Sequence, residues 1–281
     1  MKKKKFEWGY LLLLPGLGYM AAFILLSFVF MVLQSVGMIN YTGESMFTTQ
    51  YWSTFADKMF TDSLLFTIKV AVLSSLISIV ICYPLAMLLQ KTWGSKLLLS
   101  IIKMPLFIPA LVGSFLIINL IDYHGLLNQL LMWMGVISEP LRMRNDPYGI
   151  GVIAIQVWKN VPYQLILMYS ALEAIRKDVK DAARNLGAGP ISLFKNIILP
   201  LSLPNALVAV ILVFVKVFND FAVSSTAGPT YPYSLANLMY TKAYTFQEWG
   251  VSACIGVVMM IVSVLFVTVY TIIGKKLEKI M

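Results

Sequence analysis

The sequence is poor in charge, since only 12% of its 281 residues are Asp, Glu, Lys or Arg, whereas a soluble domain carries about 25%. Hydrophobic residues make up 59% of the chain, which is more than a water-soluble fold covers. This composition excludes a disordered chain, a collagen-like fibre and a disulfide scaffold. It predicts an integral membrane protein.

Residues that form disulfides or ligate metals are also scarce. The chain has two cysteines, Cys82 and Cys254, and one histidine, His124. Both cysteines lie inside long apolar runs without a paired-cysteine motif, so we expect buried thiols rather than a disulfide or metal ligands. One histidine alone does not make a histidine-based metal site, and we expect no metal.

Six apolar stretches are long enough to cross a hydrocarbon core of about 30 Å, which takes roughly 20 helical residues. They cover, approximately, residues 10–35, 64–90, 97–121, 148–172, 205–225 and 250–274. The stretches are too long and continuous for the strands of an outer-membrane barrel, which alternate over about ten residues. The predicted fold class is an all-α integral membrane protein with six transmembrane helices.

The first stretch follows a basic start, because residues 2–5 are all lysine. A signal peptide begins similarly, but this apolar run exceeds the 7–15 residues of a signal core and lacks a small-residue cleavage site. We therefore expect an uncleaved first helix. It forms a first region with its outer loop, residues 1–62, and residues 63–281 form a core of five helices.

Lysine and arginine are distributed unequally between the two sides of the six predicted spans. One side holds the N-terminal lysines, Lys91, Lys96, Arg176, Lys177, Lys180, Arg184, Lys195, Lys275, Lys276 and Lys279. The other side holds Lys58, Arg142, Arg144 and Lys242. Because the basic side faces the cytoplasm, both termini are expected to be cytoplasmic, as an even number of spans requires.

The cytoplasmic loop between the fourth and fifth spans, residues 173–204, is unusual. Residues 178–186 have helical composition, Gly-Ala-Gly-Pro at 187–190 is a helix stop and turn, and residues 191–198 return to helical spacing. We expect Pro200 and Pro204 to stop or kink the chain before it re-enters the membrane. The pattern predicts two short helices joined by a glycine elbow, and an interfacial amphipathic hairpin without a partner is the simpler alternative.

The same loop carries a gapped motif that resembles the EAA signature of ATP-binding-cassette importer permeases. The matching residues are Asp181, Ala182 and Ala183, then Gly187 after three residues, Ile197 after nine more, and Leu199 with Pro200. Asp181 stands where the family has Glu, which keeps the negative charge on a shorter side chain.

The resemblance implies that this loop docks on a separate cytoplasmic ATPase. The implied coupling residues are Asp181, Ala182, Ala183, Arg184, Gly187, Ile197, Leu199 and Pro200. Asp181 and Arg184 would fix the register of docking, and Gly187 would permit the sharp turn if its φ is positive. No G-x-x-x-x-G-K-[ST] phosphate loop is present, so the chain is expected to be non-catalytic, with ATP and magnesium bound by the ATPase.

The implied partners are a second permease subunit, expected to be a different chain, two cytoplasmic ATPase subunits and an extracellular or periplasmic solute-binding protein. The lipid bilayer surrounds the complex, and no nucleic acid is expected as a partner. The implied location is the bacterial cytoplasmic (inner) membrane, which the chain crosses several times.

Polar residues within the predicted spans are candidates for a substrate pathway, because ionisable groups at membrane depth are costly. The candidates are Lys159, Asn160, Lys216, Asn219 and Asp220. Lys216 and Asp220, one helical turn apart, could neutralise each other, pair with Lys159 to join the fourth and fifth spans, line the pathway, or snorkel. Pro105 and Pro109 are expected to be packing kinks.

The sequence gives conflicting indications of the substrate. The segment DAARNLGA, residues 181–188, resembles the permeases for polyamines, opines, phosphonates and ferric iron, whereas residues 226–244 are similar to sugar permeases. Two lysines near the membrane centre would suit an anion and repel a polyamine unless carboxylates outweigh them. We expect a polyamine-type or other small charged organic solute, with a carbohydrate as the alternative and an ion-coupled secondary transporter as a distant one.

Overall fold

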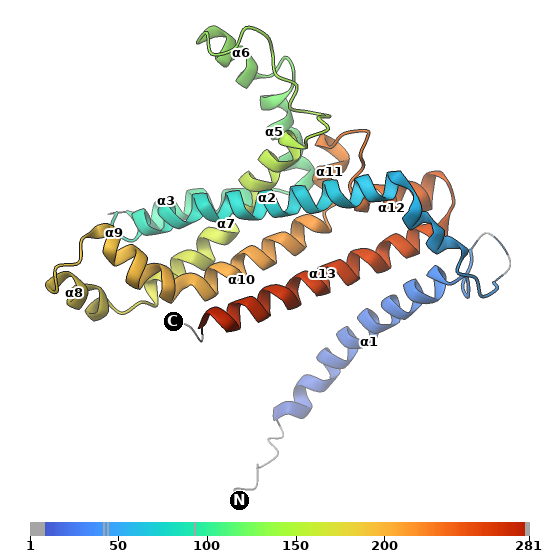
Figure 1. Cartoon of the computed structure of the whole chain (residues 1–281), viewed down its shortest axis with the longest axis horizontal. Coiled ribbons are helices and arrows are strands. Elements are labelled where there is room, and N and C mark those ends of the chain that lie inside the picture. Colours follow the sequence, from blue (N-terminus) through green and yellow to red (C-terminus); the bar gives the residue numbers. More distant parts are fainter. Residues whose placement is uncertain (1–8, 42, 44, 93, 279–281) are drawn as a thin grey trace, which may run out of the picture. The chain divides into compact units, whose positions relative to one another are not determined.

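Helix is the only regular structure over the residues that the computed structural model describes, which are 9–41, 43, 45–92 and 94–278. In hydrocarbon an unpaired backbone amide or carbonyl is costly, and a helix pairs these groups within one segment. The predicted all-α fold is confirmed for this part of the chain (Figure 1).

The helical elements follow one another along the chain with short connections. The first half contains α1 (Gly9–Ser35), η1 (Gln50–Ala56), α2 (Lys58–Leu89), α3 (Ser95–Ile102), α4 (Met104–Phe107), α5 (Ala110–Ile121), α6 (Leu126–Trp133) and α7 (Ile150–Glu173). The second half contains α8 (Lys177–Asn185), α9 (Pro190–Leu193), η2 (Phe194–Ile198), α10 (Leu199–Phe218), α11 (Ala222–Ala227), α12 (Leu235–Tyr240), η3 (Thr241–Thr245) and α13 (Trp249–Glu278).

The chain divides into two compact units. The first consists of Met1–Asp57 with Met239–Val258, and the second of Lys58–Leu238 with Met259–Met281. Helix α13 contributes to both. The functional division that we predict at residue 62 stays a prediction.

The first unit is tied together at the carboxyl end of α1. The carbonyl oxygen of Ser35 accepts hydrogen bonds from the indole Nε1 of Trp52 at 3.1 Å and from the thiol of Cys254 at 3.4 Å. The last carbonyls of a helix have no partner inside the helix, so these two donors satisfy an otherwise unpaired group. Cys254 and Cys82 are both buried and free, as predicted.

The second unit is built on α2, α7 and α10, which pack side by side (Figure 1). Small residues let membrane helices approach closely, and α2 has a buried row of them: Ser63, Thr67, Ser74, Ser75 and Ser78. From α7, the buried amide of Gln164 donates to the carbonyl of Ser75 at 3.3 Å and to that of Ala209 at 3.2 Å. One side chain therefore joins all three helices.

Five helical segments are long and apolar enough to cross a membrane within the described residues. They are Pro15–Ser35, Lys58–Leu89, Ala110–Trp133, Pro190–Phe218 and Trp249–Gly274. The fourth predicted span corresponds to α7, which has 24 residues but is not among the five. Its buried polar residues, which include Gln156, Asn160 and Gln164, lower its hydropathy while they serve its central position in the second unit.

The third predicted span, residues 97–121, is not one helix. It is divided into α3, α4 and α5, so the expectation that Pro105 and Pro109 are mere packing kinks is wrong. Pro105 lacks the N–H that would continue α3. Ile108, which precedes Pro109, is extended at φ −83° and ψ 123°, because a residue before proline is pushed out of the helical region.

The fifth predicted span, residues 205–225, differs at both ends. The helix is continuous from Pro190 through η2 and α10 to Phe218, so Pro200 and Pro204 do not stop it. In the π turn η2 the N–H of Leu199 donates to the carbonyl of Phe194, five residues earlier. A local π adjustment of this kind accommodates prolines in membrane helices.

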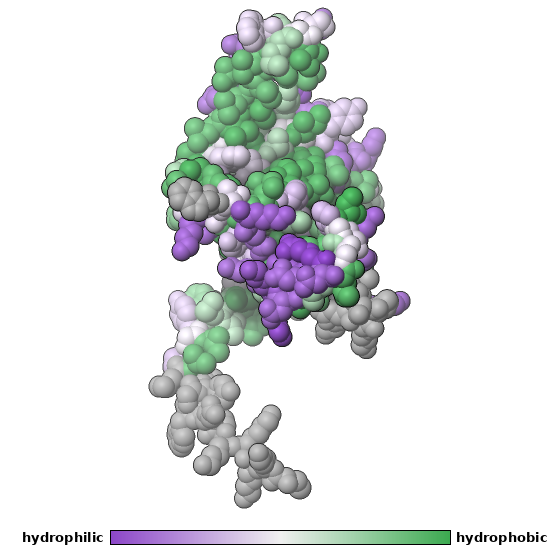
Figure 2. Space-filling model, turned by 90° about the vertical axis from the view of Figure 1, so that its left-hand side faces the viewer, coloured by the Kyte–Doolittle hydropathy of each residue, from purple (hydrophilic) through white to green (hydrophobic). Residues whose placement is uncertain are grey.

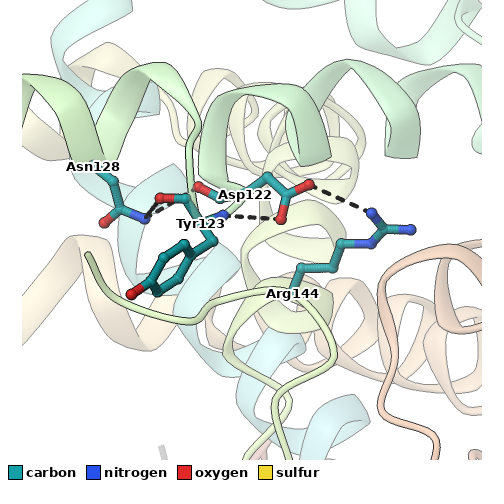
Figure 3. A network of polar contacts seen from close by, with 4 residues as sticks. All are labelled: Asp122, Tyr123, Asn128 and Arg144. Atoms are coloured by element: carbon teal, nitrogen blue, oxygen red, sulfur yellow. Dashed lines mark hydrogen bonds and ion pairs between the residues drawn. The ribbon is translucent and has the colours of Figure 1, made fainter. Parts of the chain in front are cut away.

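The connection from α5 to α7 is fixed by a buried amide (Figure 3). Asn128 on α6 donates to the carbonyls of Asp122, Tyr123 and Leu141 at 2.9–3.2 Å, and its side-chain oxygen accepts the N–H of Leu141 at 3.0 Å. Arg144 forms an ion pair with Asp122 at 3.4 Å. Asn128 thus fastens the loop before α7 to the end of α5.

We expect Asn128→Ala to destabilise this connection by about 1–3 kcal/mol, because it leaves buried backbone groups unpaired. Hydrogen exchange in the purified protein should accelerate at the amide of Leu141. The neighbouring Gln129→Ala is the control, since Gln129 is exposed and makes one bond, to the carbonyl of His124. Equal exchange at Leu141 in both variants would contradict this role of Asn128.

Candidate functional site

The loop between α7 and α10 contains the predicted pair of short helices. Helix α8 has Asp178 in its first turn and Arg184 in its last, which complements the helix dipole at both ends. Asp181 and Arg184 form an exposed ion pair at 3.0 Å, one turn apart. The helical boundaries match the prediction within one residue for α8, and α9 with η2 covers the second predicted helix.

The elbow between the two helices is a Schellman motif. The N–H of Ala188 donates to the carbonyl of Ala183 at 3.0 Å, and the N–H of Gly187 donates to that of Arg184 at 2.9 Å. Gly187 has φ +86°, and a Cβ built on it would meet nothing within 4 Å. Glycine is therefore required at this position by backbone conformation and not by space.

The two alanines of the motif face different ways. Ala183 is only 8% exposed and packs in an apolar cluster of the second unit that includes Leu172, Leu193 and Ile198. Ala182 is exposed. Ala183 thus holds α8 against its own chain, which differs from our expectation that both alanines form a surface for close approach.

The sequence did not single out the two most exposed apolar residues of this loop. Leu186 is 88% exposed and Ile191 is 72% exposed, one on each side of the glycine elbow. Helices α8 and α9, which flank that elbow, lie at an end of the second unit where hydrophilic side chains gather (Figure 2). The available signal was position, since a leucine before and an isoleucine after a Gly-Ala-Gly-Pro turn cannot both be buried by the turn itself.

The end of the motif is attached to the membrane core. Ile197 packs against the same cluster as Ala183, and Leu199 and Pro200 begin α10. The hydroxyls of Tyr83 on α2 and Ser202 on α10 hydrogen-bond to each other. The ring of Tyr83 also lies edge-on to that of Phe194, with centroids 5.5 Å apart. Displacement of the loop would therefore move α10 and be felt by α2.

A second group of polar side chains lies at the two breaks in the membrane helices. The ammonium of Lys159 on α7 donates to the carbonyl of Ile108 at 2.7 Å, between α4 and α5. The break leaves this carbonyl without a helical partner, and a lysine side chain satisfies it. Lys159 is about 14 Å from the start of α7 at 1.5 Å per residue.

Asp220 lies at the other break, between α10 and α11. Its carboxylate accepts the N–H groups of Val223 and Ser224 at 2.9 and 3.3 Å. An aspartate that caps a new helix in this way competes with continuation of the old one. For this reason Asp220 and Lys216 do not share one helix, which corrects the expectation that they lie on the same helical face.

The remaining pathway candidates have separate partners. Lys216 is in the last turn of α10 and lies 5.8 Å from the centroid of the Tyr163 ring. Asn219 donates to the carbonyl of Val215 and to Ser263 on α13. Asn160 is fully buried and donates to Gln156. Lys159, Lys216 and Asp220 interact electrostatically, but no ion pair within 4.0 Å joins them in the described part of the chain.

Comparison with known proteins gives a consistent result. Residues 78–279 match the family model described as "Binding-protein-dependent transport system inner membrane component". The spermidine/putrescine transport system permease protein PotB of Escherichia coli is 27% identical over 241 residues, covering 84% of this chain and 87% of PotB. The trehalose/maltose transport system permease protein MalF of Thermococcus litoralis is 25% identical over 285 residues, covering 98% and 96%.

Solved structures share the fold. A bacterial alginate ABC transporter, in complex with an alginate pentasaccharide-bound periplasmic protein, superposes with a TM-score of 0.79 at 16% identity, covering 96% of this chain and 94% of that one. The methionine ABC transporter MetNI gives a TM-score of 0.61 at 16% identity, covering 78% and 96%.

The chain belongs to the family of binding-protein-dependent transport system inner membrane components. It is a permease subunit of an ABC importer and a multi-pass inner-membrane protein. The predicted family is thereby confirmed. The family is the membrane component of such transporters, and the ATPase is a separate chain.

The conformation of Gly187 predicts a difference between the two glycines of the elbow. Gly187→Ala should cost about 1–2 kcal/mol, because a Cβ is strained at positive φ. Gly189, at φ −70° with equally open surroundings, should accept alanine without strain and is the matched control. Hydrogen exchange at the Ala188 amide should accelerate roughly tenfold in Gly187→Ala only; the same rate in both variants would contradict the strain argument.

Proposed function

We propose that this chain forms half of a translocation pathway whose cytoplasmic loop, residues 173–204, couples it to a separate ATPase. In this proposal α7 is the sixth span and both termini are cytoplasmic. The complete importer contains a second permease subunit of different sequence, two ATPase subunits that bind ATP and magnesium, and an external solute-binding protein. The alginate transporter solved with its periplasmic protein supports a binding protein as partner.

The observation that carries this proposal is the elbow of α8 and α9 together with its helical continuity into α10. Leu186 and Ile191 present apolar side chains that the chain itself does not cover, which suits insertion into a groove of another protein. The helix from Pro190 to Phe218 has no break, so a push on the elbow is transmitted along its whole length.

The mechanism follows from this connection. ATP binding closes the two ATPase subunits and draws the docked elbows together, and the attached α10 helices then change the pathway from inward-open to outward-open. Hydrolysis returns it. The free energy comes from the differential affinity of the ATPase pair for ATP in the two states, and this chain contributes rigid elements rather than chemistry.

The two helix breaks support a pathway beside α7. Helices α5 and α11, which follow the breaks, contact each other and both contact α7. Interrupted helices at membrane depth are a common feature of transporter binding sites. Lys159 and Asp220 are at the breaks, whereas Asn160 is buried within the chain and supports α7 instead of lining a pathway.

The substrate that we propose is a polyamine-type or other small charged organic solute. The similarity to PotB supports it, and Asp220 supplies a carboxylate at one break. The similarity to MalF favours a carbohydrate as the alternative. An ion-coupled secondary transporter, with Asp220 as carrier site, is a distant alternative because it would not need an exposed docking elbow.

The orientation of the elbow tests the proposal directly. A Leu186→Cys variant should react with a membrane-impermeant maleimide in inside-out vesicles and not in intact cells. The native Cys82 and Cys254 are buried, so the wild-type protein is the control for background. Assembly with the ATPase should protect the new cysteine.

Labelling from the cell exterior, or no protection in the assembled transporter, would contradict docking. In the same preparation Leu186→Ser should insert normally but uncouple ATP hydrolysis from uptake. Leu97→Ser is the matched control, since Leu97 is 69% exposed on α3 and outside the loop.

The substrate class is tested by loading. ATP hydrolysis by the reconstituted importer should be stimulated by its binding protein with spermidine and not with maltose. Asp220→Asn keeps the helix-capping geometry but removes the charge, and it should lower uptake of a cationic solute roughly tenfold or more if a charge-assisted contact of about 1.5–3 kcal/mol is lost. Stimulation by maltose, or unchanged cation uptake in Asp220→Asn, would favour the carbohydrate alternative.

A further inference from the structure

A basic cavity lies beside the elbow, apart from the exposed tip. It has a volume of about 600 Å³ and is lined at one side by Lys177, Lys180 and Arg184 of α8 and at the other by Lys91, just after α2. Positions 177, 180 and 184 are three and four residues apart, so they share one helical face. The coupling role described above uses neither Lys91, Lys177 nor Lys180.

The positive charge of this cavity is not neutralised by the chain. Arg184 is paired with Asp181 at 3.0 Å. Lys180 donates instead to the backbone carbonyl of Leu172 at 3.1 Å, and within the described segments no carboxylate lies within 4.0 Å of Lys91, Lys177 or Lys180. A smaller neighbouring cavity adds Glu173 and Arg176, whose charges cancel.

Burial makes this arrangement costly without an anion. Desolvation by burial, and then the positive charge of Arg184, lower the pKa of Lys180 below its usual range. An anion bound in the cavity would relieve both effects, because it stabilises the charged form of the lysine.

The shape and position of the cavity indicate which anion. Its walls include apolar side chains, among them Met87, Leu172 and Leu193, so it suits a charged group attached to an apolar body. It lies where α2 and α7 end and where the helix from Pro190 begins, which is the level of lipid headgroups if these helices span the membrane. Basic pockets between the cytoplasmic ends of membrane helices bind anionic headgroups.

We propose that this cavity binds a phosphate-bearing anion, held by Lys91, Lys177 and Lys180 beside the coupling elbow. An anionic lipid of the inner leaflet and free phosphate share this chemistry. Occupation would join the end of α2 to α8 through the anion and stiffen the base of the elbow. The inference rests on the cytoplasmic orientation proposed above, which the cysteine labelling tests separately.

The test uses the assembled importer in nanodiscs and measures the acetylation rate of individual lysines by mass spectrometry. Three conditions are compared: phosphatidylcholine alone, an equimolar mixture with phosphatidylglycerol, and phosphatidylcholine with added inorganic phosphate. Lys177 and Lys180 should be acetylated roughly fivefold more slowly when the anion is present. Lys195, which is exposed and outside the cavity, should not change.

Protection by phosphatidylglycerol alone identifies a lipid headgroup, and equal protection by inorganic phosphate identifies a free anion; either supports the site. If Lys195 slows as much as Lys180, the effect is general surface potential and the proposal is overturned. It is also overturned if both lysines react equally in all three conditions, as they would if the ATPase filled the cavity.

Variants at the opposite wall make the test independent of the labelled residues. Lys91→Gln should abolish the anion-dependent protection of Lys177 and Lys180 without altering either residue. Lys96→Gln removes the same charge from the exposed face of α3 and is the matched control. Retained protection in Lys91→Gln, or equal loss in Lys96→Gln, would overturn the assignment of Lys91 to the site.

Discussion

The constraint that governs this structure is that a backbone polar group inside a membrane must have a partner. Unbroken helices meet it automatically, and the two breaks in the second unit meet it with side chains. At the first break the ammonium of Lys159 pairs with the carbonyl of Ile108. At the second the carboxylate of Asp220 pairs with the N–H groups of Val223 and Ser224. The charged residues that look most anomalous in the sequence are therefore the ones that make a non-helical backbone tolerable at this depth.

The same constraint explains why the cytoplasmic loop is rigid. The end of α8 is completed by two backbone bonds at Gly187 and Ala188, and the prolines at the start of α10 are accommodated by the π turn before them. No unpaired segment separates the elbow from the membrane helix. Because Tyr83 contacts both Ser202 and Phe194, the elbow, α10 and α2 form one mechanical element. A lever of this kind transmits a displacement without itself binding nucleotide.

Much of this was predictable from the sequence, and the failures have a common cause. Hydrophobicity and length predicted the all-α fold, and the glycine elbow followed from the local chemistry of Gly187, which needs no knowledge of neighbours. The break at Ile108, the inward orientation of Ala183 and the separation of Lys216 from Asp220 were missed because each depends on a partner distant in sequence. The exposure of Leu186 and Ile191 was missed for the same reason. Periodicity describes one helix at a time, whereas these features arise where one element completes another.

The dual use of Lys159 and Asp220 has a consequence for transport. A substrate that bound either charge would compete with a backbone group for it, so binding would loosen the helix break that the side chain satisfies. An anion would draw Lys159 from the carbonyl of Ile108, and a cation would draw Asp220 from the start of α11. These breaks lie on different elements, α4–α5 and α10–α11, and only the second is continuous with the elbow. A cationic substrate would therefore act on the same helix that the ATPase moves. This direct mechanical route is a physical reason, independent of sequence similarity, to favour a cation over an anion.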